Sequence, residues 1–175
     1  IDTTTASHAL NLQDATAEID KSGNGTLSRP TATVFSTNFT YGLNNSNDIY
    51  IAYCFSDVEG YSKFGSYKGV VISDTEGPFV HTGFKPAMII VKEISPNGRT
   101  WMMFDNIRQP INVINRHLRA DSAAAEAGAS VFNNLDFLAN GFKWRSGTNS
   151  EPTNEAAIYL YMAWAETPFK YTTAR

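Results

Sequence analysis

The sequence has few charged residues, one cysteine and no long apolar run. Charged side chains make up 18% of the 175 residues and the formal net charge is −3, so nucleic-acid binding gains no electrostatic support. No apolar stretch reaches the roughly 18–20 residues that a membrane-spanning helix needs. We therefore expect neither nucleic acid as a partner nor insertion into a membrane.

The single cysteine, Cys54, excludes an intrachain disulfide and leaves too few thiols for a cysteine-based metal site. Because Cys54 lies inside an apolar run, we expect it to be buried as a small hydrophobic side chain. His8, His81 and His117 lie in separate segments with no ligand motif around them. We accordingly expect no metal and no other cofactor.

Sequence motifs of the common enzyme classes are missing as well. The chain has no Gly-x-Ser-x-Gly, no phosphate-binding loop and no dinucleotide-binding fingerprint. A glycosidase needs two carboxylates at a defined separation. Glu59, Glu76, Asp105 and Glu166 are available acids, but no pattern pairs any two of them. We therefore expect a protein that is not an enzyme.

What the chain does have is a series of short β-forming segments separated by turn residues. Residues 48–56 and 156–166 are the strongest, and both are apolar on both faces, which predicts central strands covered on both sides. Residues 87–94 and 100–104 flank Pro96-Asn97-Gly98, which is typical of a hairpin. Residues 133–138 and 141–146 form a second pair around Ala139-Asn140, with Gly141 in an awkward backbone conformation.

One helix is expected, over residues 121–127, because Asp121 or Ser122 caps it, alanines fill it and Gly128 ends it. Many short strands with one short helix predict an all-β antiparallel β-sandwich, lectin-like or jelly-roll-like.

The two strongest segments resemble each other. Residues 49–57 align with 158–166, and each run follows an Asn-rich turn and precedes a short aromatic tail. Two central strands of any sandwich also look alike, but the matching turns and tails favour a repeat. We therefore predict that residues 1–62 are a partial first repeat unit, or an arm packing on a neighbour, and that 63–175 are a complete sandwich unit. Since Ile1 is not an initiator Met, we expect a processed chain or a piece of a longer one.

The run Gly83–Lys92 carries a resemblance to a known family. It resembles the GF-basic-P-x-x-(V/I)-x-(V/I)-K signature of a repeated β-rich module of marine bacteriophage structural proteins, and the similarity extends over about residues 45–171. The first half-unit lacks a GF-basic-P segment, and residues 70–76 replace a Gly-rich turn.

Ten positions make up the structural signature: Gly83, Phe84, Pro86, Lys92, Trp101, Asp105, Arg108, Gly141, Phe142 and Trp164. Gly83 is expected to turn where a side chain would clash. Pro86 suits the first position of a strand, where its missing N–H is tolerated. The aromatic members are expected to bury large apolar areas. Asp105 and Arg108, three residues apart, are expected to pair across a turn.

A second set consists of aromatic residues near polar loops: Tyr41, Tyr53, Tyr61, Phe64, Tyr67 and Tyr171. Such residues stack on sugar rings and are enriched in protein interfaces. Contact with another subunit is favoured over contact with a host glycan.

Proteins of the resembled kind are tail-fibre, spike or virion-surface proteins. The resemblance therefore implies a virion structural protein at the particle surface, acting in assembly and host adhesion. Its implied partners are other virion proteins, further copies of the chain, with a trimer favoured, and a host surface glycan. A lectin-like carbohydrate-binding adhesion module is the alternative, and a glycan depolymerase is the second alternative.

Overall fold

The computed structural model describes residues 8–20, 31, 33–35, 46–70, 77–95, 98–128, 134–145 and 154–169. Every regular element in these ranges is a β-strand, and the strands form three antiparallel sheets. The predicted all-β fold class is confirmed, and the arrangement is consistent with a β-sandwich.

The chain divides into two compact units. The first unit comprises residues 1–10 and 18–55, and the second comprises residues 11–17 and 56–175. In the first unit, β1 (His8–Ala9) pairs antiparallel with β2 (Ile19–Asp20). The predicted division into repeat units at residues 62 and 63 stays a prediction.

The second unit contains a five-stranded sheet whose order is β3-β10-β5-β6-β7. Its strands are β3 (Ser62–Lys68), β10 (Ile158–Ala165), β5 (Pro86–Ser95), β6 (Met102–Asp105) and β7 (Leu118–Arg119). The longest two, β5 and β10, pair with each other, and β10 pairs with β3 on its other side. The last strand in sequence is therefore central, and β3 is an edge strand of this sheet.

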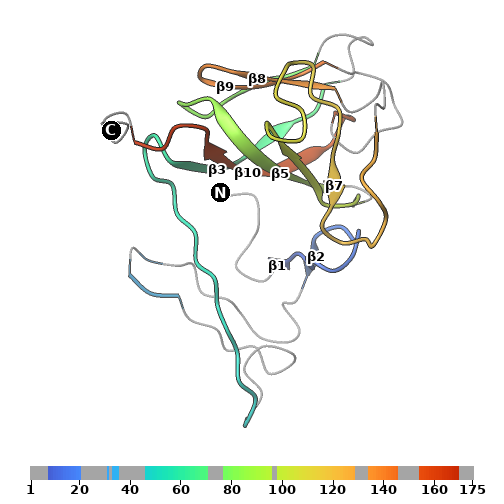
Figure 1. The fold of residues 1–175 in the computed structure, drawn as a ribbon. Coiled ribbons are helices and arrows are strands. Elements are labelled where there is room, and N and C mark those ends of the chain that lie inside the picture. The colour runs from blue at the N-terminus through green and yellow to red at the C-terminus, as the bar shows by residue number, and fades with distance from the viewer. Residues whose placement is uncertain are drawn as a thin grey trace. The chain divides into compact units, whose positions relative to one another are not determined.

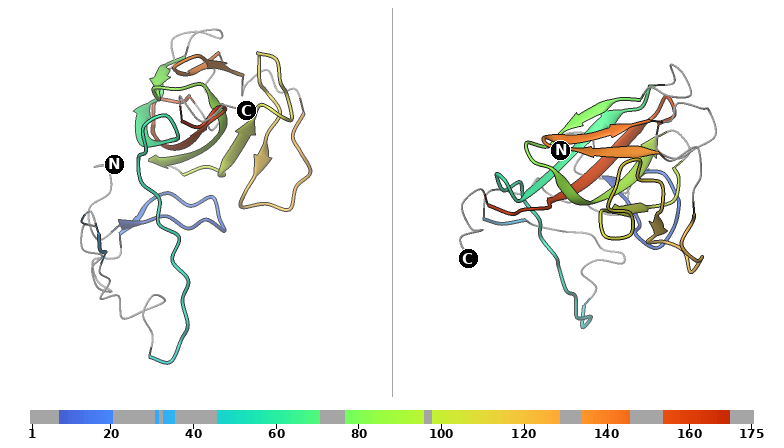
Figure 2. Two further views of the ribbon diagram at one scale, coloured as in Figure 1. Left: turned by 60° about the vertical axis from the view of Figure 1, so that its left-hand side comes forward. Right: turned by 45° about the horizontal axis from the view of Figure 1, so that its top comes forward.

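A three-stranded sheet covers the larger one, with the order β4-β9-β8. It consists of β4 (Phe79–His81), β9 (Gly141–Trp144) and β8 (Leu135–Leu138). Figures 1 and 2 show β8 and β9 as a hairpin lying across the strands β3, β10 and β5. The two sheets of this unit form the layers of the sandwich.

Alternating side chains of the two sheets fill the space between the layers. On β10, Tyr159, Tyr161 and Ala163 are buried, and Phe142 and Trp144 of β9 are buried opposite them. The ring centroids of Phe142 and Tyr161 are 5.6 Å apart at an interplanar angle of 76°. Each fully buried aromatic side chain of this kind contributes about 1.5–3 kcal/mol through the area it removes from water.

Several predicted strands are confirmed. The segment predicted at 87–94 lies in β5, the one at 100–104 overlaps β6, and the two pair antiparallel. The predicted pair around Ala139-Asn140 is the β8–β9 hairpin, and the segment at 156–166 contains β10. Pro96 and Asn97 of the first predicted turn lie outside the described residues.

Gly141 is required for a different reason than the sequence suggested. The positive φ angles of the described glycines belong to Gly60, Gly83 and Gly98, not to Gly141. A Cβ atom at Gly141 would lie 2.1 Å from the carbonyl oxygen of Val80, on the neighbouring strand β4. Gly141 therefore permits close approach of two backbones, rather than an unusual backbone conformation.

The prediction of a covered central strand at residues 48–56 is wrong. Residues 48–56 form no strand, and the side chains of Ile49 and Tyr53 are 96% and 80% exposed. Cys54, expected to be buried, is exposed with them. The apolar pattern suits a strand, but a strand forms only where a neighbouring backbone supplies hydrogen bonds, and within the described residues this segment has no ladder.

The predicted helix over 121–127 is also wrong. The carboxylate of Asp121, expected to cap it, accepts hydrogen bonds from the Thr100 hydroxyl and from the Trp101 N–H. The backbone of Ala127 forms a β-bridge with His117, donating at 3.1 Å and accepting at 3.3 Å. A two-turn helix is marginal in isolation, and these competing partners outweigh its alanine content.

Candidate functional site

The signature segment forms a turn and then the strand β5. Gly83 has a φ of 86°, and a Cβ atom there would meet only the His81 ring, at 4.0 Å. The expected side-chain clash is therefore wrong, and glycine is favoured because of the left-handed conformation. Phe84 lies in the core, and Pro86 begins β5 opposite Ala165, as its role at a strand start predicted.

Within the second unit, Lys92 and Trp101 hold residues 11–17 in place. The Lys92 ammonium donates to the carbonyl oxygens of Ala15, at 3.1 Å, and of Arg99. The Trp101 indole donates to the Asn11 carbonyl at 2.8 Å, and the ammonium lies 5.9 Å from the centroid of this ring. Burial lowers the pKa of Lys92. Both signature residues thus have structural roles.

Asp105 and Arg108 form the predicted pair. The Arg108 Nε donates to Asp105 Oδ2 at 2.8 Å, and the Arg108 and Ile107 backbone N–H groups donate to Oδ1 at 2.7 and 3.0 Å. Burial raises the pKa of the Asp105 carboxyl, but these donors outweigh burial and lower it. Arg108 also donates to Glu126 at 3.0 Å, which ties the turn to a second loop.

The remaining signature aromatics differ in burial. Phe142 is fully buried, whereas Trp164 is only half-buried and meets Phe64 edge to face at 5.8 Å. Phe64 is itself half-buried on the edge strand β3.

The other members of the loop-aromatic set are scattered. Tyr41 and Tyr171 lie outside the described residues. Tyr67 lies on β3, packs against the core and stacks on Tyr159 at 5.0 Å, and burial of its hydroxyl raises its pKa well above the usual value. Tyr53 is exposed in the first unit. Tyr61 is exposed in a turn of the second unit and thus keeps access to a partner.

Tyr61 has a stacking partner that the sequence did not single out. The rings of Tyr61 and Phe169 lie 5.3 Å apart at an interplanar angle of 12°, and the Phe169 side chain is 45% exposed. The Phe169 N–H donates to the Gly60 carbonyl at 3.1 Å, and the Ala165 N–H donates to the Tyr61 carbonyl at 2.8 Å. The chain after β10 is therefore fixed beside the turn before β3.

A large hollow of about 880 Å³ opens at this end of the sandwich. It is lined by residues 59–60, 83–85, Ala139, Thr167 and Phe169. Backbone hydrogen bonds join its walls: Gly83 N–H donates to the Asn140 carbonyl at 3.2 Å, and Glu166 N–H donates to the Lys85 carbonyl at 2.9 Å. Segments far apart in the sequence thus form one concave surface, and backbone hydrogen bonds connect them.

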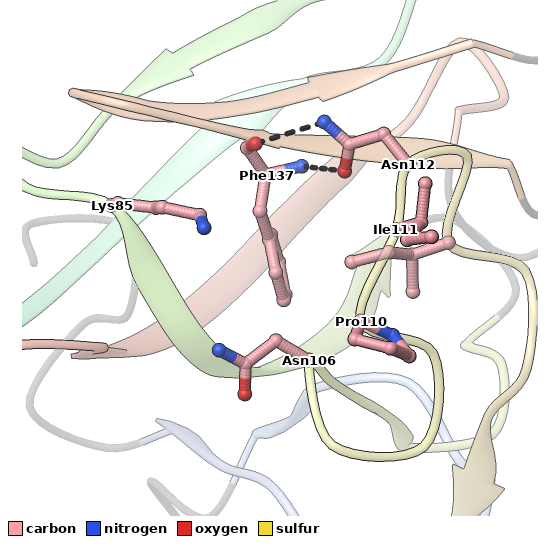
Figure 3. A pocket seen from close by; sticks show the side chains of 7 residues that line it. Lys85, Asn106, Pro110, Ile111, Asn112 and Phe137 are labelled. Atoms are coloured by element: carbon pink, nitrogen blue, oxygen red, sulfur yellow. Dashed lines mark hydrogen bonds between the residues drawn. The ribbon is translucent and has the colours of Figure 1, made fainter.

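A small hollow of about 330 Å³ adjoins the large one, because Lys85 lines both. Figure 3 shows the Phe137 ring between Lys85 on one side and Pro110 and Ile111 on the other. The Asn112 side chain donates to the Phe137 carbonyl and accepts from the Phe137 N–H, both at 3.0 Å. These two bonds pin the apolar wall to the edge of β8.

Three polar side chains meet at Lys85, and of these Lys85 and Asn106 line the hollows whereas Glu166 does not. Lys85 Nζ lies 2.9 Å from Glu166 Oε2, and the Asn106 amide donates to Glu166 Oε1 at 2.7 Å. The three side chains lie near the surface, so the ion pair contributes little to stability. The ion pair instead fixes positions, because it and the Asn106 hydrogen bond hold an ammonium, a carboxylate and an amide side by side.

Sequence reasoning missed this combination. Glu166 was noted only as an acid without a partner, and Lys85 only as the basic position of the signature. Phe169 belongs to the aromatic tail after 158–166, which was the one signal available. The site brings together turns that nothing in the local sequence connects.

One known protein family covers almost the whole chain. A family model described as "Domain of unknown function (DUF7483)" matches residues 1–168. The chain belongs to this family. The matched span includes the signature segment, the exposed segment 49–55, the small hollow, and the lining of the large hollow except Phe169. Neither the comparison with curated proteins nor that with solved structures finds a match.

Among the described residues, no group of three or more His, Cys, Asp or Glu side chains is arranged to hold a metal ion. The same part of the chain contains no helix long and apolar enough to cross a membrane.

Proposed function

We propose that this chain is a structural module of a bacteriophage particle, in a tail fibre, a spike or a head-surface decoration. It acts in assembly and in host adhesion, without enzymatic activity. The proposal rests on the resemblance of Gly83–Lys92 to phage structural modules, together with the exposed apolar segment formed by residues 49–55. Its place is the particle surface, among other virion proteins.

The exposed segment carries the proposal. Ile51 and Phe55 are 78% and 62% exposed, and Ile49 and Tyr53 are more exposed than either, at 96% and 80%. Contiguous exposed apolar surface of this kind marks an interaction site. A surface protein of a particle is built to bury such surface against its neighbours.

We propose a second copy of the chain as the occupant of this segment. Residues 49–57 resemble 158–166, and the strand β10 within the latter pairs with β3 on one side and β5 on the other. Within the described residues, the outer edge of β3 carries the bridge from Val58 to Ser62 and the hydrogen bond from Phe64 N–H to Asp57 Oδ1 at 2.8 Å. We propose that a strand resembling β10, supplied by another copy, adds to this edge beyond Phe64 by β-strand addition.

This exchange makes a homo-oligomer, and a trimer is the order that we favour. A strand donated from each copy to the next closes a ring when the rotation between copies allows it. Each donated strand would supply both backbone hydrogen bonds and buried apolar side chains.

Analytical ultracentrifugation of the full chain tests the assembly role. We expect an oligomer that dissociates when Ile49, Ile51 and Tyr53 are replaced together by Ser. The unfolding free energy measured on the dilute monomer should stay unchanged, because the exposed segment contributes to stability only in the oligomer. The matched control replaces Ile107, Ile111 and Val113 by Ser, which are also exposed but lie on another loop. This control variant should keep the oligomer.

Two results count against the proposal. A chain that is monomeric at all concentrations removes the exchange between copies. Probing purified phage particles with an antibody against the chain tests the virion role. If the chain is absent from the particles, that role is removed.

A further inference from the structure

We propose that the large hollow and the small hollow together bind a short stretch of a neutral saccharide. The inference goes beyond the assembly role and does not rest on it, because both hollows lie within the second unit. Phe169, Lys85 and Asn106 line the hollows, and Glu166 holds Lys85 and Asn106 in place from outside the lining. None of the four belongs to the loop-aromatic set predicted from the sequence.

Size and shape agree with such a ligand. Small-molecule sites occupy about 300–1,000 Å³ and combine apolar walls with a few oriented polar groups. The hollows measure about 880 and 330 Å³, and Lys85 lines both. A ligand in either hollow therefore has Lys85 within its walls, and we propose that its rings extend over both.

Phe169 supplies a platform for a sugar ring. One face of a pyranose consists of C–H groups, which pack on an aromatic face. Phe169 lines the large hollow and stacks on Tyr61 at 5.3 Å, and its backbone N–H bond to Gly60 fixes its position. The platform is thus formed before a ligand arrives, which lowers the entropic cost of binding.

The polar groups at the junction match a pair of neighbouring hydroxyls. An ammonium has three donors, and a side-chain amide has two N–H donors and an acceptor oxygen. Lys85 and Asn106 both donate to Glu166, which keeps these two lining side chains next to each other. Their remaining donors and the Asn106 amide oxygen suit a vicinal diol.

Charge narrows the ligand class. Lys85 lies against the carboxylate of Glu166, and Glu59 brings a second carboxylate to the lining of the large hollow. The site therefore has no excess of positive charge to attract a sulfated, phosphorylated or carboxylated sugar. A neutral hexose oligomer fits better than an anionic one.

Rigid walls support the assignment. The Thr82 and Gly83 N–H groups both donate to the Asn140 carbonyl, at 3.0 and 3.2 Å. Asn106 N–H donates to the Ala87 carbonyl at 2.9 Å. These bonds connect three walls of the hollows, so that the ligand groups keep their spacing.

The test is titration of the full chain with neutral trisaccharides of gluco, galacto and manno configuration, followed by saturation-transfer NMR and calorimetry. Sialyllactose and a heparin tetrasaccharide serve as anionic probes. We expect at least one neutral trisaccharide to bind and both anionic probes to bind at least tenfold more weakly.

Phe169→Ala should weaken that binding about tenfold, as loss of one stacking contact implies. The matched control is Phe79→Ala, because Phe79 is equally exposed, at 45%, but lines neither hollow. The control variant should bind as the unchanged chain does. Glu166→Gln, which keeps the shape but removes the ion pair, should weaken binding to a smaller extent, and melting temperatures should show that all three variants fold.

Three results overturn the proposal: no binding of any neutral probe at millimolar concentration, preference for an anionic probe, or binding that Phe169→Ala and Phe79→Ala change equally. None of them bears on the oligomer measured by ultracentrifugation, so failure here is distinct from failure of the assembly role.

Discussion

The strand β10 and the segment 49–55 resemble each other in apolar pattern but lie in opposite environments. Tyr159 aligns with Tyr50, yet Tyr159 is fully buried and Tyr50 is 44% exposed. The difference lies in the neighbours. Tyr159 lies on a strand paired on both sides, whereas the described residues provide the segment with no strand partner.

This comparison shows what apolar patterning establishes and what it leaves open. The pattern identifies a segment that is stable as a strand once it has neighbours on both faces. It does not say whether those neighbours belong to the same chain. In β10 they do, and in the segment we propose that they come from another copy.

The largest expected effect separates the two aligned tyrosines. Tyr159→Ala should lower the free energy of unfolding by about 3–5 kcal/mol, because it leaves a cavity and removes the stack on Tyr67. It also removes the hydroxyl that accepts from the Glu155 N–H at 2.9 Å. The measurement is urea unfolding followed by tryptophan fluorescence.

Tyr50→Ala is the matched variant. It should change the unfolding free energy of the dilute monomer by no more than about 0.5 kcal/mol, as expected for an exposed position. Equal losses for both variants would contradict the contrast, because they would mean that the segment is already packed within one chain.

A smaller effect is expected on the pH dependence of the unfolding free energy of the sandwich. His117 is buried beside Phe104, with ring centroids 5.4 Å apart, and burial lowers its pKa. Arg119 also lowers this pKa, while the Asn115 backbone and Glu126 raise it. The unfolded chain therefore binds a proton before the folded chain does, so the contribution of His117 is complete above about pH 6.5 and declines below it.

Unfolding measured between pH 7.5 and 5 should show this decline, with a slope of at most about 1.4 kcal/mol per pH unit for one proton. His117→Leu should flatten the profile, and His81→Leu, at an exposed position, should not. A profile that His117→Leu leaves unchanged would assign the decline to other groups.

Much of the sandwich could be predicted from the sequence, for identifiable reasons. The runs at 87–94 and 156–166 are long and apolar, and the β8–β9 pair surrounds a recognisable turn. Strands of two residues, such as β7, are too short to leave a pattern. The helix predicted at 121–127 failed because the partners of Asp121 and Ala127 lie elsewhere in the chain.

The candidate site was less accessible to prediction. The pairing of Asp105 with Arg108 followed from their spacing in a turn. The contact of Lys85 with Glu166 spans 81 positions, and that of Asn106 with Glu166 spans 60. Such contacts depend on the order of strands in the sheet, which local sequence does not reveal.

The most direct test of the central claim, that segment 49–55 is completed by another copy, is amide hydrogen exchange at several protein concentrations. We predict that exchange in this segment slows as the concentration rises, until it approaches the slow exchange of β10, and that β3 slows in step with it. Fast exchange of residues 49–55 at every concentration, with β10 protected throughout, would contradict the claim.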